Sequence, residues 1–197
     1  MNRSSPRVAA ALAGLMLLLP ALAHAHAGGE HTHGLLAGIS HPLSGADHLL
    51  AMLAVGAWSA QQGGRSLWVL PAAFVGMLVV GGALGMSGMP LPQVEQGIQL
   101  SLLVLGLLLV FALRVSPFLG AVLVGAFALF HGHAHGTEMG ATVAALPYAT
   151  GFALSTALLH GVGIGGVLLL HRTARAQLLA RAGGALVAVG GLWFAVA

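Results

Sequence analysis

The chain has 197 residues, of which 58% are hydrophobic and only 6% are charged, and its formal net charge is +3. Soluble domains carry roughly 25% charged residues, so this composition excludes an ordinary water-soluble protein and leaves no material for a sizeable soluble domain beside several membrane spans. The seven basic residues are all arginines scattered along the chain, which excludes a nucleic-acid surface, and the absence of cysteine excludes disulfides and thiolate metal ligands.

The first predicted element is a cleavable secretory signal peptide over residues 1–25. Arg3 and Arg7 precede an apolar run, after which a proline and small residues follow. The run is about a dozen residues long, shorter than the roughly 20 that a membrane span needs, although an uncleaved first helix is the alternative. We expect cleavage after Ala25, or after Ala23 as the second choice, because small residues occupy the required positions.

The mature chain is expected to begin with a polar, histidine-bearing segment, residues 26–34, followed by a membrane domain, residues 35–197. Hydropathy and helix-breaking residues predict about six spans in this domain, so the fold class is an all-α polytopic membrane protein. Glycines inside the spans, such as Gly81 and Gly184, favour close packing of helices and not a chemical role. We expect the spans at residues 35–60, 66–86, 95–113, 117–135, 142–170 and 182–197.

The arginines beyond the signal predict the orientation, because cytoplasmic loops retain positive charge. With an exported N-terminus, all of them fall on connections at the cytoplasmic side, and both mature termini lie in the periplasm. Glu95 and Glu138 lie at or near the outer side. We therefore expect a multi-pass protein of the bacterial cytoplasmic (inner) membrane, with the lipid bilayer as its main partner. The arginines in question are Arg65, Arg114, Arg172, Arg175 and Arg181.

The first span contains His41, Asp47 and His48 in otherwise apolar sequence. Charged groups at the centre of a bilayer cost at least about 2.5–3.5 kcal/mol each, so these residues are candidates for function. In an unbroken helix, the two histidines lie on one face but roughly 10 Å apart along the axis. Ligands of one ion lie only about 2.0–2.1 Å from it. Either the histidines are successive stations for an ion, or Pro42 and Gly45 interrupt the helix and bring them together.

A second group, His131, His133, His135 and Glu138, ends the fourth span. His131 and His135 are four residues apart and His135 and Glu138 are three apart, so each pair lies on one helix face and can chelate an ion. Counted from the outer surface, His131 and His135 lie near the depth of the first cluster, so two helices can supply a joint site. A buried polar network that only holds helices together is the alternative.

The fifth span adds His160, which lies deeper, towards the cytoplasm. A lone histidine in a helix is more often a packed, hydrogen-bonded residue than a metal ligand. The nitrogen and oxygen ligands of the two clusters suit nickel, cobalt, zinc or copper(II), and the order of metal affinities does not choose among these ions.

The spacing His41-x5-Asp47-His48, followed by Phe130-His-Gly-His-Ala-His-Gly-Thr-Glu138, resembles the HupE/UreJ family of hydrogenase and urease accessory membrane proteins. The similarity covers essentially the whole mature chain, and the first motif is also similar to the His-x4-Asp-His signature of nickel/cobalt transporters. The resemblance implies a nickel permease that supplies hydrogenase or urease maturation proteins. It gives metal-route roles to His41, Asp47, His48, His131, His135 and Glu138. We add His26, His31, His33, His133 and His160 as further candidate ligands.

The function predicted is therefore a permease and not an enzyme, with a divalent ion as cargo, Ni²⁺ before Co²⁺, Zn²⁺ or Cu²⁺, and no resident cofactor. The chain has no G-x-x-x-x-G-K-[ST] segment to bind ATP phosphates, so the ion gradient, protons or the membrane potential must supply the energy. Two alternatives are a membrane nickel receptor or chaperone without transport, and an intramembrane metal-dependent hydrolase. The hydrolase is disfavoured because His-Glu-x-x-His is absent.

Overall fold

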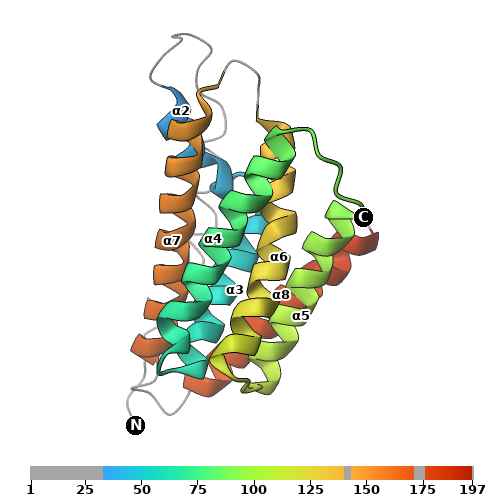
Figure 1. Ribbon diagram of the computed structural model, residues 1–197. Helices are drawn as coiled ribbons and strands as arrows, with labels where there is room; N and C mark the ends of the chain where they lie inside the picture. The colour runs from blue at the N-terminus through green and yellow to red at the C-terminus, as the bar shows by residue number, and fades with distance from the viewer. Residues whose placement is uncertain (1–32, 140–142, 171–175, 197) are drawn as a thin grey trace. The chain divides into compact units, whose positions relative to one another are not determined.

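Apolar segments of this length fold into helices because a backbone in hydrocarbon must satisfy all its polar groups internally. The computed structural model describes residues 33–139, 143–170 and 176–196, and these are helical without strands (Figure 1). The predicted signal peptide, His26, His31, Arg172 and Arg175 lie outside the described residues. In chain order the elements are α2 (His33–Ser40), the 3₁₀ helix η2 (His41–Leu43), α3 (Ala46–Gln62), α4 (Ser66–Met86), α5 (Val94–Phe111), α6 (Pro117–Glu138), α7 (Ala145–Leu170) and α8 (Ala176–Val196).

Within the described residues, the five helices α4 to α8 are long and apolar enough to cross a membrane. The limits of α4 are those predicted, whereas α6 continues past His135 to Glu138 and ends where Met139 turns to an extended conformation. Helix α8 begins at Ala176, earlier than predicted, because the residues that follow are good helix formers. Arg181 therefore lies inside a helix and not in the connection before it.

The first predicted span, residues 35–60, is not one continuous helix. Pro42 has no backbone N–H to donate to an α-helix, so α2 ends at Ser40 and the 3₁₀ helix η2 begins at His41. Gly45 then adopts an extended conformation, with φ −101° and ψ 118°, and starts α3. The helix is thus interrupted, as one of the two alternatives expected, and the rings of His41 and His48 each contact that of His135.

Consecutive long helices run in opposite directions, so their connections alternate between two ends of the bundle (Figure 1). The side chain of Gln62, at the end of α3, donates to the carbonyl oxygen of Leu113 at 2.7 Å. Arg114 and Arg181 line one small cavity at this same end. Glu138 lies at the far end of α6, which has 22 residues and is therefore about 33 Å long. The arginine-bearing end and the end at Glu138 are thus opposite.

Helices α4 and α6 pack against each other through glycine. A Cβ atom at Gly132 would overlap the carbonyl oxygen of Leu78, and one at Gly136 would overlap that of Gly82. From the other side, a Cβ atom at Gly81 would overlap α6. Only glycine permits this contact between helix backbones, which is the role expected for small residues in a membrane protein.

The same kind of contact joins two further helix pairs. Gly56 of α3 lies against the carbonyl oxygen of His160 on α7, and Gly163 of α7 lies equally close to α3. Helices α5 and α8 meet where Gly106 faces Gly184. The packing role expected for Gly81 and Gly184 is therefore confirmed at both positions.

Large apolar side chains such as Trp58, Phe74 and Leu102 are fully buried between these contacts. The interior also contains histidines, each at most 7% exposed, which is unusual because a buried polar group needs a partner. These buried histidines are His48, His131, His133, His135 and His160.

We predict that Gly132→Ala destabilises the protein by about 1–3 kcal/mol, because the added methyl group must push α4 away from α6. Gly166→Ala is the matched control, since nothing lies within 4 Å of the Cβ position at Gly166. Thermal unfolding in detergent should show a lower midpoint for Gly132→Ala alone. Equal midpoints for the two variants would contradict the close contact between α4 and α6.

Candidate metal centre

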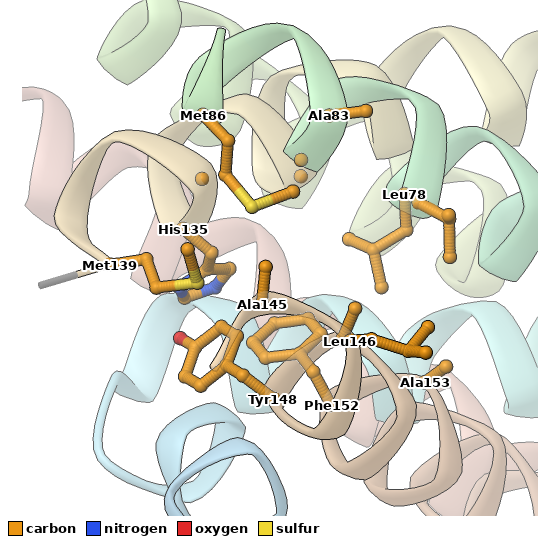
Figure 2. Close-up of a pocket in the computed structure, with 15 residues that line it drawn as sticks. Leu78, Ala83, Met86, His135, Met139, Ala145, Leu146, Tyr148, Phe152 and Ala153 are labelled. Atoms are coloured by element: carbon orange, nitrogen blue, oxygen red, sulfur yellow. The ribbon is translucent and has the colours of Figure 1, made fainter. Parts of the chain in front are cut away.

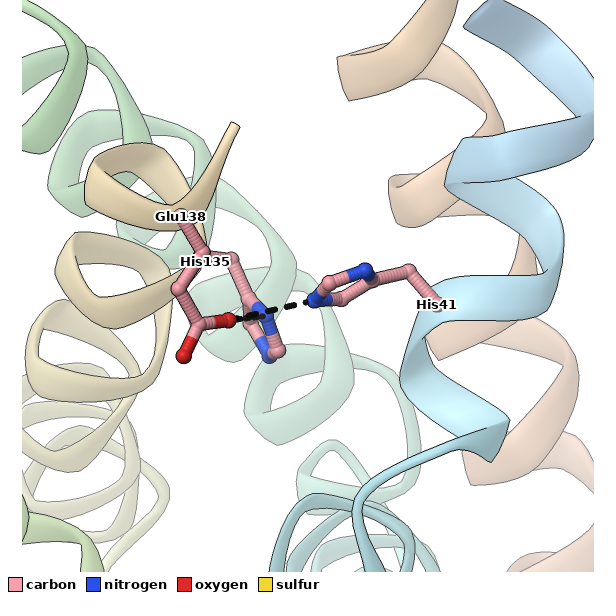
Figure 3. A group of neighbouring side chains, drawn as sticks. All are labelled: His41, His135 and Glu138. Atoms are coloured by element: carbon pink, nitrogen blue, oxygen red, sulfur yellow. Dashed lines mark hydrogen bonds and ion pairs between the residues drawn. The ribbon is translucent and has the colours of Figure 1, made fainter. Parts of the chain in front are cut away.

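Three side chains from two segments meet at one point, and we call them the His41 site: His41, His135 and Glu138 (Figure 3). One potential ligand atom from each lies within 4.8 Å of the others. Nε2 of His41 is 3.3 Å from Oε2 of Glu138, and Nδ1 of His135 is 3.6 Å from the same oxygen. Ligands at about 2.1 Å from one ion lie roughly 3 Å apart, so small movements would complete a metal site.

The break in the first span places His41 at this site. Figure 3 shows its ring extending from η2 towards α6, where His135 and Glu138 lie one turn apart on the same face. The side chain of Glu138 is 58% exposed, that of His41 30% and that of His135 only 7%. The His41 site is therefore open at Glu138 and closed at His135.

Asp47 orients the ring of His48. Its Oδ1 accepts hydrogen bonds from the backbone N–H of His48 at 2.8 Å and from ring Nδ1 at 2.9 Å. A carboxylate can only accept, so Nδ1 carries the proton and Nε2 of the neutral ring keeps its lone pair. This Nε2 is buried and has no hydrogen-bond partner among the described residues. Carboxylates commonly fix metal-binding histidines in this way.

The ring of His48 connects the His41 site to a deeper histidine. Its centroid is 4.1 Å from that of His135 and 4.6 Å from that of His131. The first and second sequence clusters therefore meet, although Asp47 itself lies outside the three-residue group and contributes by holding His48.

Ser101 of α5 fixes the orientation of His131. The Ser101 hydroxyl donates its hydrogen to the carbonyl oxygen of Ile98 at 2.6 Å, so its oxygen accepts from Nε2 of His131 at 2.9 Å. Nδ1 of His131 then keeps a lone pair, and this buried atom is unpaired within the described part of the chain. Both nitrogens of His135 are also buried without a hydrogen-bond partner there.

His133 makes a different contact from His131 and His135, the two histidines that flank it. Its Nε2 donates to the carbonyl oxygen of Met89 at 2.7 Å and so ties α6 to the connection between α4 and α5. His160, on α7, is 1% exposed and contacts Phe74 at 5.1 Å between ring centroids, so it too lies outside the His41 site. His33 is the first residue of α2.

Two aromatic residues of α7 line the His41 site, and the sequence analysis missed them. The ring of Phe152 is 4.4 Å from that of His135, and the ring of Tyr148 is 5.7 Å from that of His41. Their spacing was the available signal, because Tyr148, Phe152, Thr156 and His160 recur every four residues and share one face of α7.

A cavity of about 300 Å³ opens beside His135, between α4, α6 and α7 (Figure 2). Its lining is mainly apolar, and Met86, Met139 and Leu146 belong to it. Figure 2 shows the rings of Tyr148 and Phe152 close to His135 at its edge. The imidazole of His135 therefore borders an apolar space on this side.

We predict opposite phenotypes for two neighbouring histidines of α6. His135→Phe should weaken Ni²⁺ binding at least about tenfold and leave the unfolding midpoint nearly unchanged, because it keeps a ring in the same packing and the lost ring nitrogens have no internal hydrogen bond. His133→Ala should lower stability by about 1 kcal/mol through loss of the bond to Met89 but leave Ni²⁺ binding unchanged. Calorimetric titration and thermal unfolding of both variants test this; a reversed pattern would refute the assignment.

Comparison with known proteins agrees with the resemblance seen in the two motifs. The family profile described as "HupE / UreJ protein" matches residues 14–194. Protein HupE of Rhizobium leguminosarum bv. viciae is 46% identical over 175 residues, which cover 89% of this chain and 91% of that protein. No solved structure matches the chain. The chain therefore belongs to the HupE/UreJ family.

Proposed function

We propose that this protein is a membrane permease for a divalent transition-metal ion, with Ni²⁺ as the favoured cargo, and that it supplies hydrogenase or urease maturation. The observation that supports the proposal is the meeting of His41, His135 and Glu138 next to His48 and His131 inside a bundle of apolar helices. Nitrogen and carboxylate ligands without thiolate suit nickel and its neighbours in the periodic table.

The exposed fraction of the side chains decreases from Glu138 to His131, which suits inward movement of an ion from Glu138. Glu138 reaches solvent and offers a negative charge, while His131 is fully buried. An ion that enters at Glu138 would exchange bound water for imidazole nitrogen step by step, which offsets the cost of bringing a charge into hydrocarbon. Asp47 keeps a second negative charge close to the route and holds the lone pair of His48 available.

The proposed topology places the His41 site at the outer side of the cytoplasmic membrane. Arg114 and Arg181 lie at the opposite end of the bundle, which suits the cytoplasmic side. After removal of the signal peptide, α2, η2 and α3 together would complete a sixth crossing, so both mature termini would be periplasmic. Inward movement of a divalent cation then gains about 4.6 kcal/mol per 100 mV of membrane potential.

We expect Asp47→Asn to lower Ni²⁺ uptake into sealed proteoliposomes at least about tenfold, with thermal stability preserved. Asparagine keeps an oxygen that can accept both bonds from His48 and removes only the charge. Glu95→Gln is the matched control, because Glu95 is an exposed carboxylate at the start of α5 and does not belong to the His41 site.

Uptake is measured with a metal indicator inside the vesicles at equal protein incorporation. Native uptake by the Asp47→Asn protein would reject the ion-site assignment. Ni²⁺ binding without uptake by the native protein would favour the receptor or chaperone alternative.

We also predict the outcome of fusing reporter enzymes after Ala197. A reporter that works only after export should be active there, and a reporter that works only in the cytoplasm should be inactive. A fusion within the connection at Arg114 should show the opposite behaviour, since it lies at the other end of the bundle. Cytoplasmic activity of the fusion after Ala197 would reverse the proposed topology and place the His41 site on the cytoplasmic side.

A further inference from the structure

Phe74 of α4 contacts two buried histidines that belong to different helices. Its ring centroid is 5.9 Å from that of His131 on α6 and 5.1 Å from that of His160 on α7. Phe74 and His131 are 0% exposed and His160 is 1% exposed. The aromatic ring therefore occupies the space beside both imidazoles at the centre of the bundle.

Helix α7, which Phe74 contacts through His160, carries buried polar atoms without hydrogen-bond partners among the described residues. Neither ring nitrogen of His160 has a hydrogen-bond partner in the described residues, and the same holds for the hydroxyl of Thr156. Thr156 and His160 are four residues apart and share one face of α7. Buried polar groups normally have partners, so unpaired atoms at this depth require an explanation. We call these two residues the His160 site.

The surroundings of Phe74 are apolar. Leu70 and Leu78 lie one turn before and after it on α4, and Val124 and Ala128 of α6 belong to the same buried cluster. The face of a phenylalanine ring attracts cations weakly but supplies no lone pair to replace bound water. Apolar constrictions of this kind block ions by excluding water.

We infer that Phe74 is the gate between two ion-binding stations, the His41 site with its neighbours His48 and His131 on one side and the His160 site on the other. The inference rests on the proposed function and deepens it. The ring must move before a divalent transition-metal ion can leave Nδ1 of His131 and reach the nitrogens of His160. Phe74 thereby keeps the two stations from opening to both sides of the membrane together.

The absence of cysteine from the chain permits a direct test of this gate. His160→Cys introduces a single thiol, and a membrane-impermeant thiol reagent is added to sealed vesicles of either orientation. With Phe74 present, reaction from the side at which Glu138 is exposed should be slow. In the double variant with Phe74→Ala, we expect reaction from that side to be at least tenfold faster. Equal rates would overturn the proposal, and this measurement needs no metal.

Leu70→Ala is the matched control for the cavity that the substitution creates. Leu70 is also fully buried and lies one turn away on the same helix, so its truncation loosens the same region but leaves the ring in place. The thiol in the Leu70→Ala background should stay slow to react. If Phe74→Ala does not fold, Phe74→Leu keeps most of the apolar volume without the ring and should still speed the reaction several-fold.

Measurement of metal flux shows whether the gate proposal or the permease proposal is wrong. In proteoliposomes with native His160, Phe74→Ala should pass Ni²⁺ faster and also admit Mg²⁺, which the native protein should exclude. Native transport with unchanged rate and selectivity in Phe74→Ala would reject the gate and retain the permease. Faster thiol reaction in a protein that transports no metal would support the barrier and reject the permease.

Discussion

Contact between helix backbones, made possible by glycine, determines how close the histidines of this protein can come to one another. Gly132 and Gly136 hold one face of α6 on α4, while His131 and His135 project from α6 towards α3 and η2. Gly56 holds α3 against α7 beside His160 in the same way. Because the ligand atoms of the His41 site are separated by little more than the distance that one ion requires, a side chain at these glycines would displace the helices that carry them and change that separation.

The main features of the fold could be predicted from sequence because hydropathy and helix periodicity are local properties. The limits of α4 and the pairing of His131 with His135 on one face both follow from such properties. The interruption at Pro42 could be named only as an alternative, since the local sequence permits a kinked helix as well as a broken one. Packing of η2 against α6 and α7 decides between them.

The candidate site could be predicted in part, and the remainder depends on contacts between distant helices. Ser101 and Phe74 are ordinary residues of apolar helices, and only the assembled bundle shows that each touches a histidine. His133 belongs to the same motif as His131 and His135. Because it lies two residues from each of them along the helix, its side chain faces Met89 instead. Asp47 was expected to have a role in the metal route, and only the structure shows that its Oδ1 accepts from the ring of His48.

Residues 131–136 are six consecutive buried positions on α6, so this stretch has no lipid-facing side. A helix at the edge of a membrane bundle normally exposes some of its positions, and evolution can exchange apolar residues there freely. Here the histidines, the glycines and Ala134 are all buried. Divergence among relatives should therefore be lowest along these two turns and highest on outward-facing positions such as Trp68 and Leu186.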